Sequence, residues 1–580
     1  MTKLLRFLKP YWWQLLLLLG VVFLQVAANL SLPDYMAKII NDGIVAKNSD
    51  LIWSTGGVML LVSLGGAAAT VVVSFFAARI ATGFAKDIRQ LVFEQVESYS
   101  LTEFNKFSTA SLITRSTNDI QQIQMVLVMV LRLVLMAPLT AVWAIYKAYQ
   151  NAPSMTWIMI LAVVILLSII ISLFIIAIPK FTRLQQLVDR LNLVTREILT
   201  GLRVIRAFNT ESSEEKKFDE ANVDVTKINL FVNRLTVFMF PMMMLIMNIT
   251  MLSVVWVGAH LIDAGSLEIG QMLAFMQYAM QVIFSFLMIS IIFILIPRAS
   301  VSAKRVAAVL ETPSTIIDPT APLLFPEKRT GLVEFDHVTF SYPGADVPVL
   351  KDISFVAKSG ETTAFIGSTG SGKSTLINLI PRFYDVTNGI IKIDGVDIRQ
   401  VKLEDLYSGI GYVPQQGVLF SGTVNSNIKY GAPDATVEAV KQAVKTAQAT
   451  EFVEKLDGGY DAPIAQSGTN VSGGQKQRLS IARAIIRQPQ IYIFDDSFSA
   501  LDMKTDALLR QALRAETHDK TVLIVAQRIS TIMQADKIIV LDEGNVVGQG
   551  THQELMKTCA VYREIASSQL SETELSTISI

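Results

Sequence analysis

Long apolar runs dominate the first half of the chain. Five of them are free of charges and reach the length of about 20 residues that a helix needs to cross the hydrocarbon of a membrane, while a sixth contains Arg132. The six runs are residues 13–32, 56–78, 125–146, 155–179, 235–259 and 271–297. No such run recurs beyond Pro297. We therefore predict six membrane-spanning helices followed by a globular region.

The segments between these runs set the orientation in the membrane. Residues 79–121 and 180–234 keep a helical pattern, so we predict that the spans continue beyond the membrane as long helices. These two segments hold 15 Lys and Arg residues, against three in the segments on the opposite side. By the positive-inside rule, both termini and the globular region are predicted to be cytoplasmic. Lys3, Arg6 and Lys9 also give the first run a resemblance to a signal peptide, but six spans place both termini on one side.

Composition supports a membrane protein and bounds its partners. Hydrophobic residues make up 51% of the 580 residues and charged residues 17%, with fifty positive and fifty negative charges. No net basic field attracts nucleic acid, and we expect no nucleic-acid partner. The single cysteine, Cys559, excludes an intrachain disulfide. We expect a transmembrane domain over residues 1–310, a proline-punctuated linker over 311–330 and a nucleotide-binding domain over 331–580.

A phosphate-binding loop follows a short apolar strand in the globular region. The sequence Gly367-Ser-Thr-Gly-Ser-Gly-Lys-Ser-Thr375 fits the pattern GxxxxGK[ST] and precedes an apolar helix face. Its residues are Gly367, Ser368, Thr369, Gly370, Ser371, Gly372, Lys373, Ser374 and Thr375. Glycines let backbone N–H groups cradle phosphate oxygens at a helix N-terminus, where Lys373 neutralises the β- and γ-phosphates and Ser374 ligates Mg²⁺. We predict that this loop binds ATP with Mg²⁺.

Two further patterns follow in the same domain. The apolar strand 491–494 ends in Asp495, a hard oxygen ligand for Mg²⁺ as in a Walker B strand. Between the loop and this strand, Ser472, Gly473, Gly474 and Gln475 open a helix. A hydroxyl and glycine amides at a second helix N-terminus predict a second anion-binding end.

These motifs resemble those of the ABC transporter family, over nearly the whole chain. The resemblance implies an α/β ATPase domain after six spans, the arrangement of type IV exporter halves. Tyr342 resembles the aromatic residue that stacks on adenine, and Gln415 the glutamine that senses Mg²⁺ and the γ-phosphate. The resemblance further implies that two halves pair head to tail, so that Ser472–Gln475 and Asp502 contact the ATP of the partner. Segments around Thr109–Arg115 and Gly201–Glu214 resemble the coupling helices.

The chain departs from the family pattern at three places. Asp496 stands where the family has the glutamate that activates the attacking water, and its carboxylate is about 1.5 Å shorter in reach. Gln527 replaces the switch histidine and cannot become cationic. Ala465-Gln-Ser-Gly468 replaces Gly-Glu-Arg-Gly before the signature. We predict a site that holds ATP and turns it over slowly, paired with a non-identical half that has Glu after its Walker B aspartate. The departures resemble those of bacterial heterodimeric multidrug exporters.

The transported compound is left open by the sequence. Few charges in the spans argue against a strongly ionic substrate, so amphipathic drugs, lipids and hydrophobic peptides all remain candidates. Methionines of the fifth span and polar and aromatic residues of the sixth either line a substrate surface, or face lipid or pack between helices. They are Met239, Met242, Met243, Met244, Met247, Met251, Phe275, Gln277, Tyr278, Gln281, Phe284 and Phe286. Arg132 either snorkels or contacts the substrate. The alternatives to multidrug export across the cell membrane are a lipid flippase, a peptide exporter and an ATP-gated regulator or channel.

Overall fold

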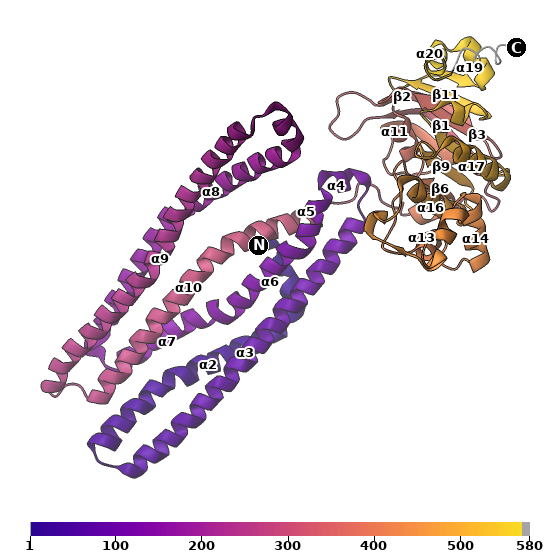
Figure 1. Cartoon of the computed structure of the whole chain (residues 1–580). Coiled ribbons are helices and arrows are strands. Elements are labelled where there is room, and N and C mark those ends of the chain that lie inside the picture. The colour runs from indigo at the N-terminus through magenta and orange to yellow at the C-terminus, as the bar shows by residue number, and fades with distance from the viewer. Residues whose placement is uncertain (1, 571–580) are drawn as a thin grey trace. The chain divides into compact units, whose positions relative to one another are not determined.

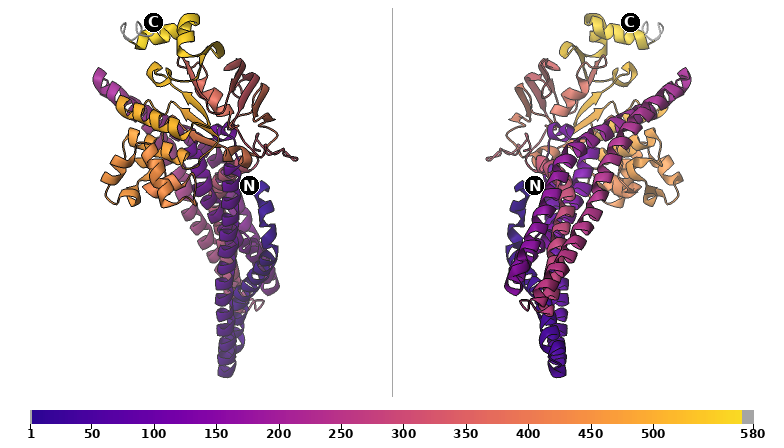
Figure 2. Two further views of the ribbon diagram at one scale, coloured as in Figure 1. Left: turned by 90° about the vertical axis from the view of Figure 1, so that its right-hand side faces the viewer. Right: turned by 90° about the vertical axis from the view of Figure 1, so that its left-hand side faces the viewer.

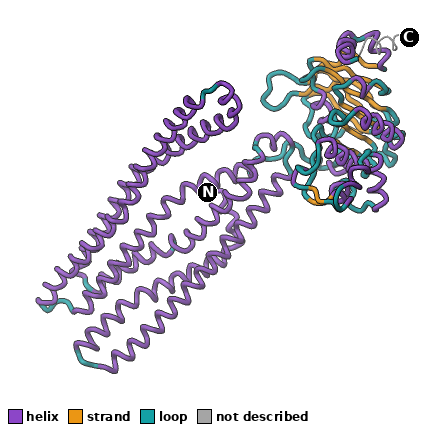
Figure 3. The backbone as a smooth tube through the Cα atoms, viewed as in Figure 1, coloured by secondary structure: helices purple, strands orange, loops and turns teal. Residues whose placement is uncertain are grey.

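The structure, a computed structural model, describes residues 2–570. Contacts divide the chain into two units, and each is described by itself. The first unit takes in the residues up to Glu97 together with Ser108–Thr312, and the second takes in Ser98–Phe107 together with the residues from Pro313 onward. Figure 3 shows that the strands of the described chain belong to the second unit and that the first is helical.

The first unit holds six helical segments long and apolar enough to cross a membrane, counted over the described residues. Its elements are α1 (Thr2–Leu5), η1 (Arg6–Tyr11), α2 (Trp12–Lys38), η2 (Ile39–Val45), α3 (Ser49–Glu97), α5 (Thr109–Thr114), η3 (Arg115–Asp119), α6 (Ile120–Met129), η4 (Val130–Val134), α7 (Met136–Asn151), η5 (Pro153–Met155), α8 (Thr156–Phe208), α9 (Glu211–Asp263) and α10 (Ile269–Leu310). Each apolar run lies within one of these helical segments, so the prediction of six spans is confirmed.

The helices are far longer than a membrane is thick. Helices α8 and α9 have 53 residues each, which at ~1.5 Å per residue is about 80 Å, against the ~30 Å of a hydrocarbon core. Figures 1 and 2 show the two helices side by side along this length. The predicted helical extensions are therefore confirmed. The third span is interrupted by the π-helical turn η4, where the side chain of Arg132 is exposed on the unit.

The fourth and fifth spans are joined by a small apolar cluster. Met243 of α9 is 3% exposed and packs with Leu166 and Ile170 of α8 and with Ile283 of α10. Met247 lies against the same cluster. Of the two interpretations of the fifth-span methionines, packing between helices therefore describes these two residues.

The second unit is an α/β domain with three sheets. Its strands are β1 (Val333–Phe340), β2 (Leu350–Ala357), β3 (Thr362–Gly367), β4 (Asn388–Ile393), β5 (Val396–Asp397), β6 (Ile410–Val413), β7 (Gly422–Thr423), β8 (Pro463–Ile464), β9 (Ile491–Asp495), β10 (Thr521–Val525), β11 (Lys537–Asp542) and β12 (Asn545–Gly550). The six-stranded sheet has the order β12-β11-β3-β10-β9-β6, and its strands are parallel except for β12 at one edge. An antiparallel sheet has the order β2-β1-β4-β5, and β7 pairs with β8.

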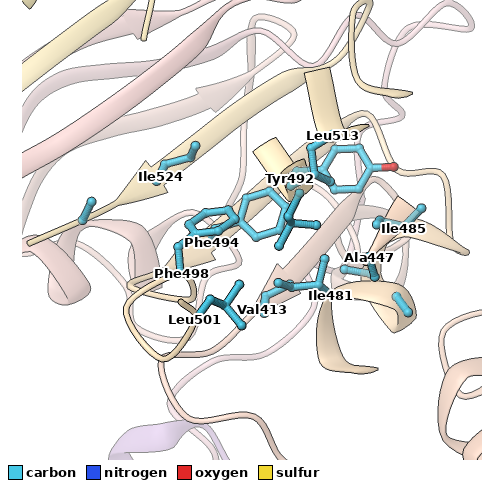
Figure 4. Packing of buried hydrophobic residues seen from close by; sticks show 14 of the residues in the cluster. Val413, Ala447, Ile481, Ile485, Tyr492, Phe494, Phe498, Leu501, Leu513 and Ile524 are labelled. Carbon is cyan, nitrogen blue, oxygen red and sulfur yellow. The ribbon is translucent and has the colours of Figure 1, made fainter. Parts of the chain in front are cut away.

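Helices accompany these sheets. They are α4 (Leu101–Lys106), α11 (Lys373–Leu379), α12 (Leu403–Ser408), α13 (Val424–Lys429), α14 (Val437–Thr446), α15 (Thr450–Lys455), η6 (Gly459–Asp461), η7 (Gln466–Gly468), α16 (Gly473–Ile485), α17 (Met503–Glu516), α18 (Ile529–Ile532), α19 (His552–Thr558) and α20 (Ala560–Gln569). All five residues of β9 and of β10 are buried, as expected for parallel strands covered on both faces. Figure 4 shows Tyr492 and Phe494 of β9 packed among aliphatic side chains that include Ile481 and Leu513.

The parallel strands bring the loops of interest to one edge of the sheet. Strands β3, β6, β9 and β10 end at Gly367, Val413, Asp495 and Val525. Because parallel strands share a direction, their carboxyl ends lie at a common edge, which is where α/β sheets bind ligands. The phosphate loop, Gln415, Asp496 and Gln527 follow these ends directly.

The short helix α4 belongs to the second unit although it is an early part of the chain. Leu101 packs against the core cluster that includes Phe340 and Tyr384, and the Asn105 side-chain amide donates to the Tyr384 hydroxyl at 3.2 Å. The segment expected as a coupling helix, Thr109–Arg115, belongs to the first unit, as α5 and the start of η3, and its role in coupling stays a prediction. The sequence held a sign of α4 a few residues earlier: Ser100 and Glu103 form a capping box.

Candidate functional site

The phosphate loop connects β3 to α11 through a tight backbone path. A Cβ atom on Gly367 would lie 2.0 Å from the carbonyl oxygen of Leu541, so no side chain fits there. Gly372 has a φ of +97°, and a Cβ on it would meet Leu350 at 2.7 Å. The sequence therefore needs glycine at both positions to bend the loop over the end of the sheet.

Lys373 lies over this loop as the first residue of α11. Its ammonium group donates to the carbonyl oxygens of Gly367 at 2.9 Å and Ser368 at 2.7 Å, and to the Ser371 hydroxyl at 3.4 Å. Burial lowers the pKa of Lys373, while the charges of Asp496 and Asp495 oppose that change. The amine is held by carbonyls at the mouth of the loop, the location that a phosphate-binding cation requires.

A hydroxyl and a carboxylate converge next to the lysine. Ser374 donates to Asp495 Oδ1 at 2.9 Å, and Asp495 is buried. Burial raises the pKa of Asp495, and the bond from Ser374 and the charge of Lys373 work against that rise. A serine oxygen, a buried carboxylate and a lysine at the end of a glycine loop fit ATP with Mg²⁺, since Mg²⁺ prefers such hard oxygen ligands. Ser374 and Asp495 would hold the metal, and Lys373 and the loop backbone the phosphates.

Asp496 lies where the loops that follow β6, β9 and β10 meet. It has a left-handed backbone, with φ +46°, and its side chain turns back toward the neighbouring loops. Asp496 Oδ2 accepts from the side-chain amide of Gln527 at 2.8 Å and from that of Gln415 at 3.2 Å. Burial raises the pKa of Asp496, and the hydrogen bonds from Gln415 and Ser499 oppose the rise. The structure thus brings together the three residues that the sequence placed at the γ-phosphate.

The candidate adenine-stacking residue lies at the other end of the phosphate loop. The hydroxyl of Tyr342 is 3.0 Å from that of Thr375. Its ring meets Phe340 and Tyr384 edge to face, at centroid distances of 5.0 and 5.4 Å. The half-buried ring therefore borders the loop, and its stacking on adenine stays a prediction.

The residues expected to meet a partner's ATP cap their own helices. Ser472 accepts from the backbone N–H of Gln475 at 3.3 Å, and the Gln475 side chain accepts from the Ser472 N–H at 2.8 Å, which closes a capping box at α16. Asp502 caps α17 by accepting from the Thr505 N–H at 2.9 Å. Gly473 and Gly474 form the first turn of α16, and Gly474 lies close to Ala500 of the loop before α17.

Comparison with known proteins assigns the family. Residues 15–286 match the family model of the ABC transporter transmembrane region, and residues 350–499 match that of the ABC transporter. The chain is 40% identical to an ABC transporter ATP-binding protein of Mycobacterium tuberculosis, over 97% of each chain. The chain belongs to the ABC transporter family. It is also 33% identical to a multidrug efflux ATP-binding/permease protein of that organism, over 95% of this chain and 46% of that protein.

The fold is that of an ABC exporter half-transporter. A solved bacterial exporter of the Atm1 family, with ATP bound, superimposes with a TM-score of 0.81 at 25% identity and covers 97% of this chain and 98% of its own. Such a half-transporter is a membrane protein that couples ATP hydrolysis to transport.

The membrane unit of this half-transporter contains a cavity of about 380 Å³, a volume within the range of small-molecule sites. It lies among α2, η4, α7 and α10. Three side-chain amides provide hydrogen-bond donors and acceptors, and apolar and hydroxyl side chains complete the wall. The lining residues are Asn29, Leu32, Leu133, Met136, Ala137, Thr140, Gln277, Met280, Gln281, Phe284, Ser285 and Met288. None of these described residues is charged. Sequence reasoning named Gln277, Gln281 and Phe284 but missed the first and third spans, which contribute the other half without any motif.

An ionic cluster joins α2, α7 and α10 near the cavity. Lys147 of α7 forms an ion pair with Asp34 Oδ2 of α2 at 2.8 Å. The hydroxyl of Tyr278, beside Gln277 on α10, donates to the other oxygen of Asp34. Charged residues among spans are rare and are usually paired when they occur. The pair was missed because Lys147 and Asp34 lie outside the apolar runs.

Proposed function

We propose that this chain is the slow-hydrolysing half of a heterodimeric exporter that moves uncharged, amphipathic compounds out of the cell. The observation that carries the first part is the environment of Asp496, whose Oδ2 accepts from the amides of both Gln527 and Gln415. The two amides hold this carboxylate in one position and occupy one of its oxygens, and aspartate reaches less far than glutamate toward an attacking water. Gln527 places a neutral amide at the position where a cationic histidine would stabilise the negative charge that develops on the γ-phosphate during hydrolysis.

The roles of the residues follow from their contacts. When bound, ATP with Mg²⁺ supplies the phosphoanhydride whose hydrolysis drives transport. Lys373 and the loop backbone bind phosphate, and Ser374 and Asp495 hold the metal. Gln415 and Gln527 fix the Asp496 carboxylate, so this site would hold ATP and hydrolyse it slowly. The capped N-terminus of α16, with Ser472, serves the ATP of the unlike partner.

The membrane cavity supports the substrate class. Amides and hydroxyls without charge favour compounds that hydrogen-bond but carry no fixed strong charge, and Met136, Met280 and Met288 adapt to many shapes. A multidrug efflux relative supports drugs as one such class of compound, and a fatty acid transporter relative supports lipids equally well. The charge distribution of the loops supports a cytoplasmic ATPase domain. The likeness to an exporter supports transport out of the cell.

A gain of activity tests the slow site. Asp496→Glu with Gln527→His in the full-length chain restores both missing groups, and we expect ATP turnover to rise by about tenfold or more, since a ~1 Å error in position can cost ~100-fold. Asp496→Gln should change turnover little. Adding Lys373→Ala to the double variant should remove the gained activity. Brisk turnover by the unmodified chain alone, lost in Asp496→Gln, would refute the slow site and favour a homodimer.

Transport assays separate the substrate classes. In proteoliposomes that hold the chain with its partner half, we expect ATP-dependent uptake of neutral amphiphilic dyes into inside-out vesicles. Translocation of fluorescent lipid without dye transport would instead identify a flippase. Ion current in the absence of ATP turnover would identify a channel.

A further inference from the structure

The loop that carries Gln527 is held by the end of the C-terminal helix. Gln569, the last residue of α20, donates from Nε2 to the backbone oxygen of Gln527 at 2.8 Å. Its Oε1 accepts from the backbone N–H of Ile529, also at 2.8 Å. One amide thus bonds to both sides of a loop that has left the β10 ladder, in the manner of a neighbouring strand.

Other contacts hold the residues on either side of this peptide. The backbone N–H of Ala526 donates to the backbone oxygen of Phe365 at 3.2 Å, and the Arg528 guanidinium donates to that of Ser499 at 3.4 Å. Arg510 of α17 donates to the backbone oxygens of Ser530 at 3.0 Å and Thr531 at 3.2 Å, and is itself paired with buried Asp506. Ile529 is fully buried in the core of the domain. These contacts anchor α18 and the residues beside it, whereas the bonds from Gln569 reach the peptide of Gln527 itself.

The peptide of Gln527 determines where its side chain lies. From this backbone the Gln527 amide donates to Asp496 Oδ2 at 2.8 Å. Hydrogen bonds at the backbone and at the side chain of Gln527 therefore link α20 to the Asp496 carboxylate. Since the bond from Gln569 is to the backbone, it does not depend on which side chain occupies position 527.

The end of α20 is itself rigidly placed. Tyr562 and Ala566 are fully buried, and the Tyr562 hydroxyl lies 2.7 Å from His552 Nδ1 of α19. Leu570 packs against the same core. Gln569 is exposed, so its replacement removes two hydrogen bonds without opening a cavity. Its effect can be separated from folding.

We propose that Gln569 is a positioning residue of the nucleotide site, and that the C-terminal helix sets ATP turnover by fixing the loop that carries Gln527. The inference rests on the proposed function only in that this site binds and hydrolyses ATP. It applies to whichever chain hydrolyses ATP briskly, the Asp496→Glu/Gln527→His chain or the unmodified one.

The test measures ATP hydrolysis by the full-length chain under single-turnover conditions, and by the Asp496→Glu/Gln527→His chain in the steady state. We expect Gln569→Ala to lower the hydrolysis rate of the Asp496→Glu/Gln527→His chain by about tenfold, because misplacement by ~1 Å costs up to ~100-fold. In the unmodified chain the loss should be as large only if that chain hydrolyses ATP briskly. The KM for ATP should stay within about twofold, since Lys373 and the phosphate loop are untouched. Ser568→Ala is the matched control: Ser568 is also exposed and bonds to Ile565 of its own helix.

A second variant tests the pH dependence of activity, which would not change if Gln569 only stabilised the fold. Gln569→Glu keeps the acceptor for Ile529, but only its protonated form can donate to the Gln527 oxygen. Its activity relative to the unmodified chain should therefore rise as pH falls toward the carboxyl pKa. Three outcomes would each overturn the proposal. Ser568→Ala could lower activity as much as Gln569→Ala does, or Gln569→Ala could leave the hydrolysis rate unchanged. The third is a relative activity of Gln569→Glu that does not vary with pH. If the Asp496→Glu/Gln527→His chain shows no gain in turnover, the proposal of a slow site is refuted. The role of Gln569 is then tested by the hydrolysis rate of Gln569→Ala in the otherwise unmodified chain.

Discussion

The nucleotide site and the membrane cavity are assembled in opposite ways. The nucleotide site gathers short contiguous motifs at the ends of adjacent parallel strands, and one cooperative sheet positions all of them. The cavity takes single side chains from three helices that are far apart in the chain. A changed residue in the first site therefore acts on one reaction step, whereas a changed residue in the second alters the selection among substrates.

The largest expected effect separates the two regions outright. Lys373→Ala removes the ammonium group that caps the phosphate loop, and the loss of a charged hydrogen bond of about 2–3 kcal/mol predicts roughly 30- to 150-fold weaker ATP binding. Photolabelling of the full-length chain with an azido-ATP analogue would measure it. Lys358→Ala, an exposed lysine of the same domain, is the control and should bind as the unmodified chain does. Substrate binding to the membrane cavity should be unchanged in both variants.

A substitution in the cavity should show the reverse pattern. Gln281→Leu keeps the size of the side chain but removes an amide, so compounds that hydrogen-bond should bind about 1–2 kcal/mol more weakly, or roughly five- to thirtyfold. Purely apolar compounds should bind as before. Substrate-dependent quenching of tryptophan fluorescence would measure the shift, with Gln185→Leu on the exposed surface of α8 as the control. Equal losses for both classes of compound would show that Gln281 acts on folding.

The ionic cluster beside the cavity should have a smaller effect, on stability. Asp34→Asn leaves Lys147 without its ion pair, and because both side chains are about a third exposed the expected cost is only about 1 kcal/mol. The midpoint of thermal unfolding in detergent should fall by a few degrees. Adding Lys147→Met should restore much of the loss, since it removes the unpaired charge. A double variant less stable than either single one would mean that Lys147 has another partner.

The comparison also explains what the sequence could predict. Spans and stalks follow from long apolar runs, because only helices satisfy the backbone in hydrocarbon. Asp495, Asp496 and Gln527 could be placed together because each closely follows a predicted buried strand. Residue 569 has no such marker, since its role arises from where α20 ends. The lining of the cavity depends on how each helix is rotated about its axis, and near-uniform hydrophobicity does not reveal that rotation. Gln277 lines the cavity, whereas Met243 of the fifth span packs against α8 and α10.

Met243 gives the smallest expected effect and decides between the two interpretations of the fifth span. Met243→Leu conserves volume within the cluster of α8, α9 and α10, so it should cost less than about 1.5 kcal/mol and leave substrate affinity within about twofold. Met280→Leu, on the cavity wall, should instead change the order of preference among substrates of different shape, because leucine is stiffer than methionine. The same fluorescence titration measures both. A selectivity change in Met243→Leu equal to that in Met280→Leu would return the fifth span to the substrate path, because packing alone gives no reason for substrates to distinguish the two side chains.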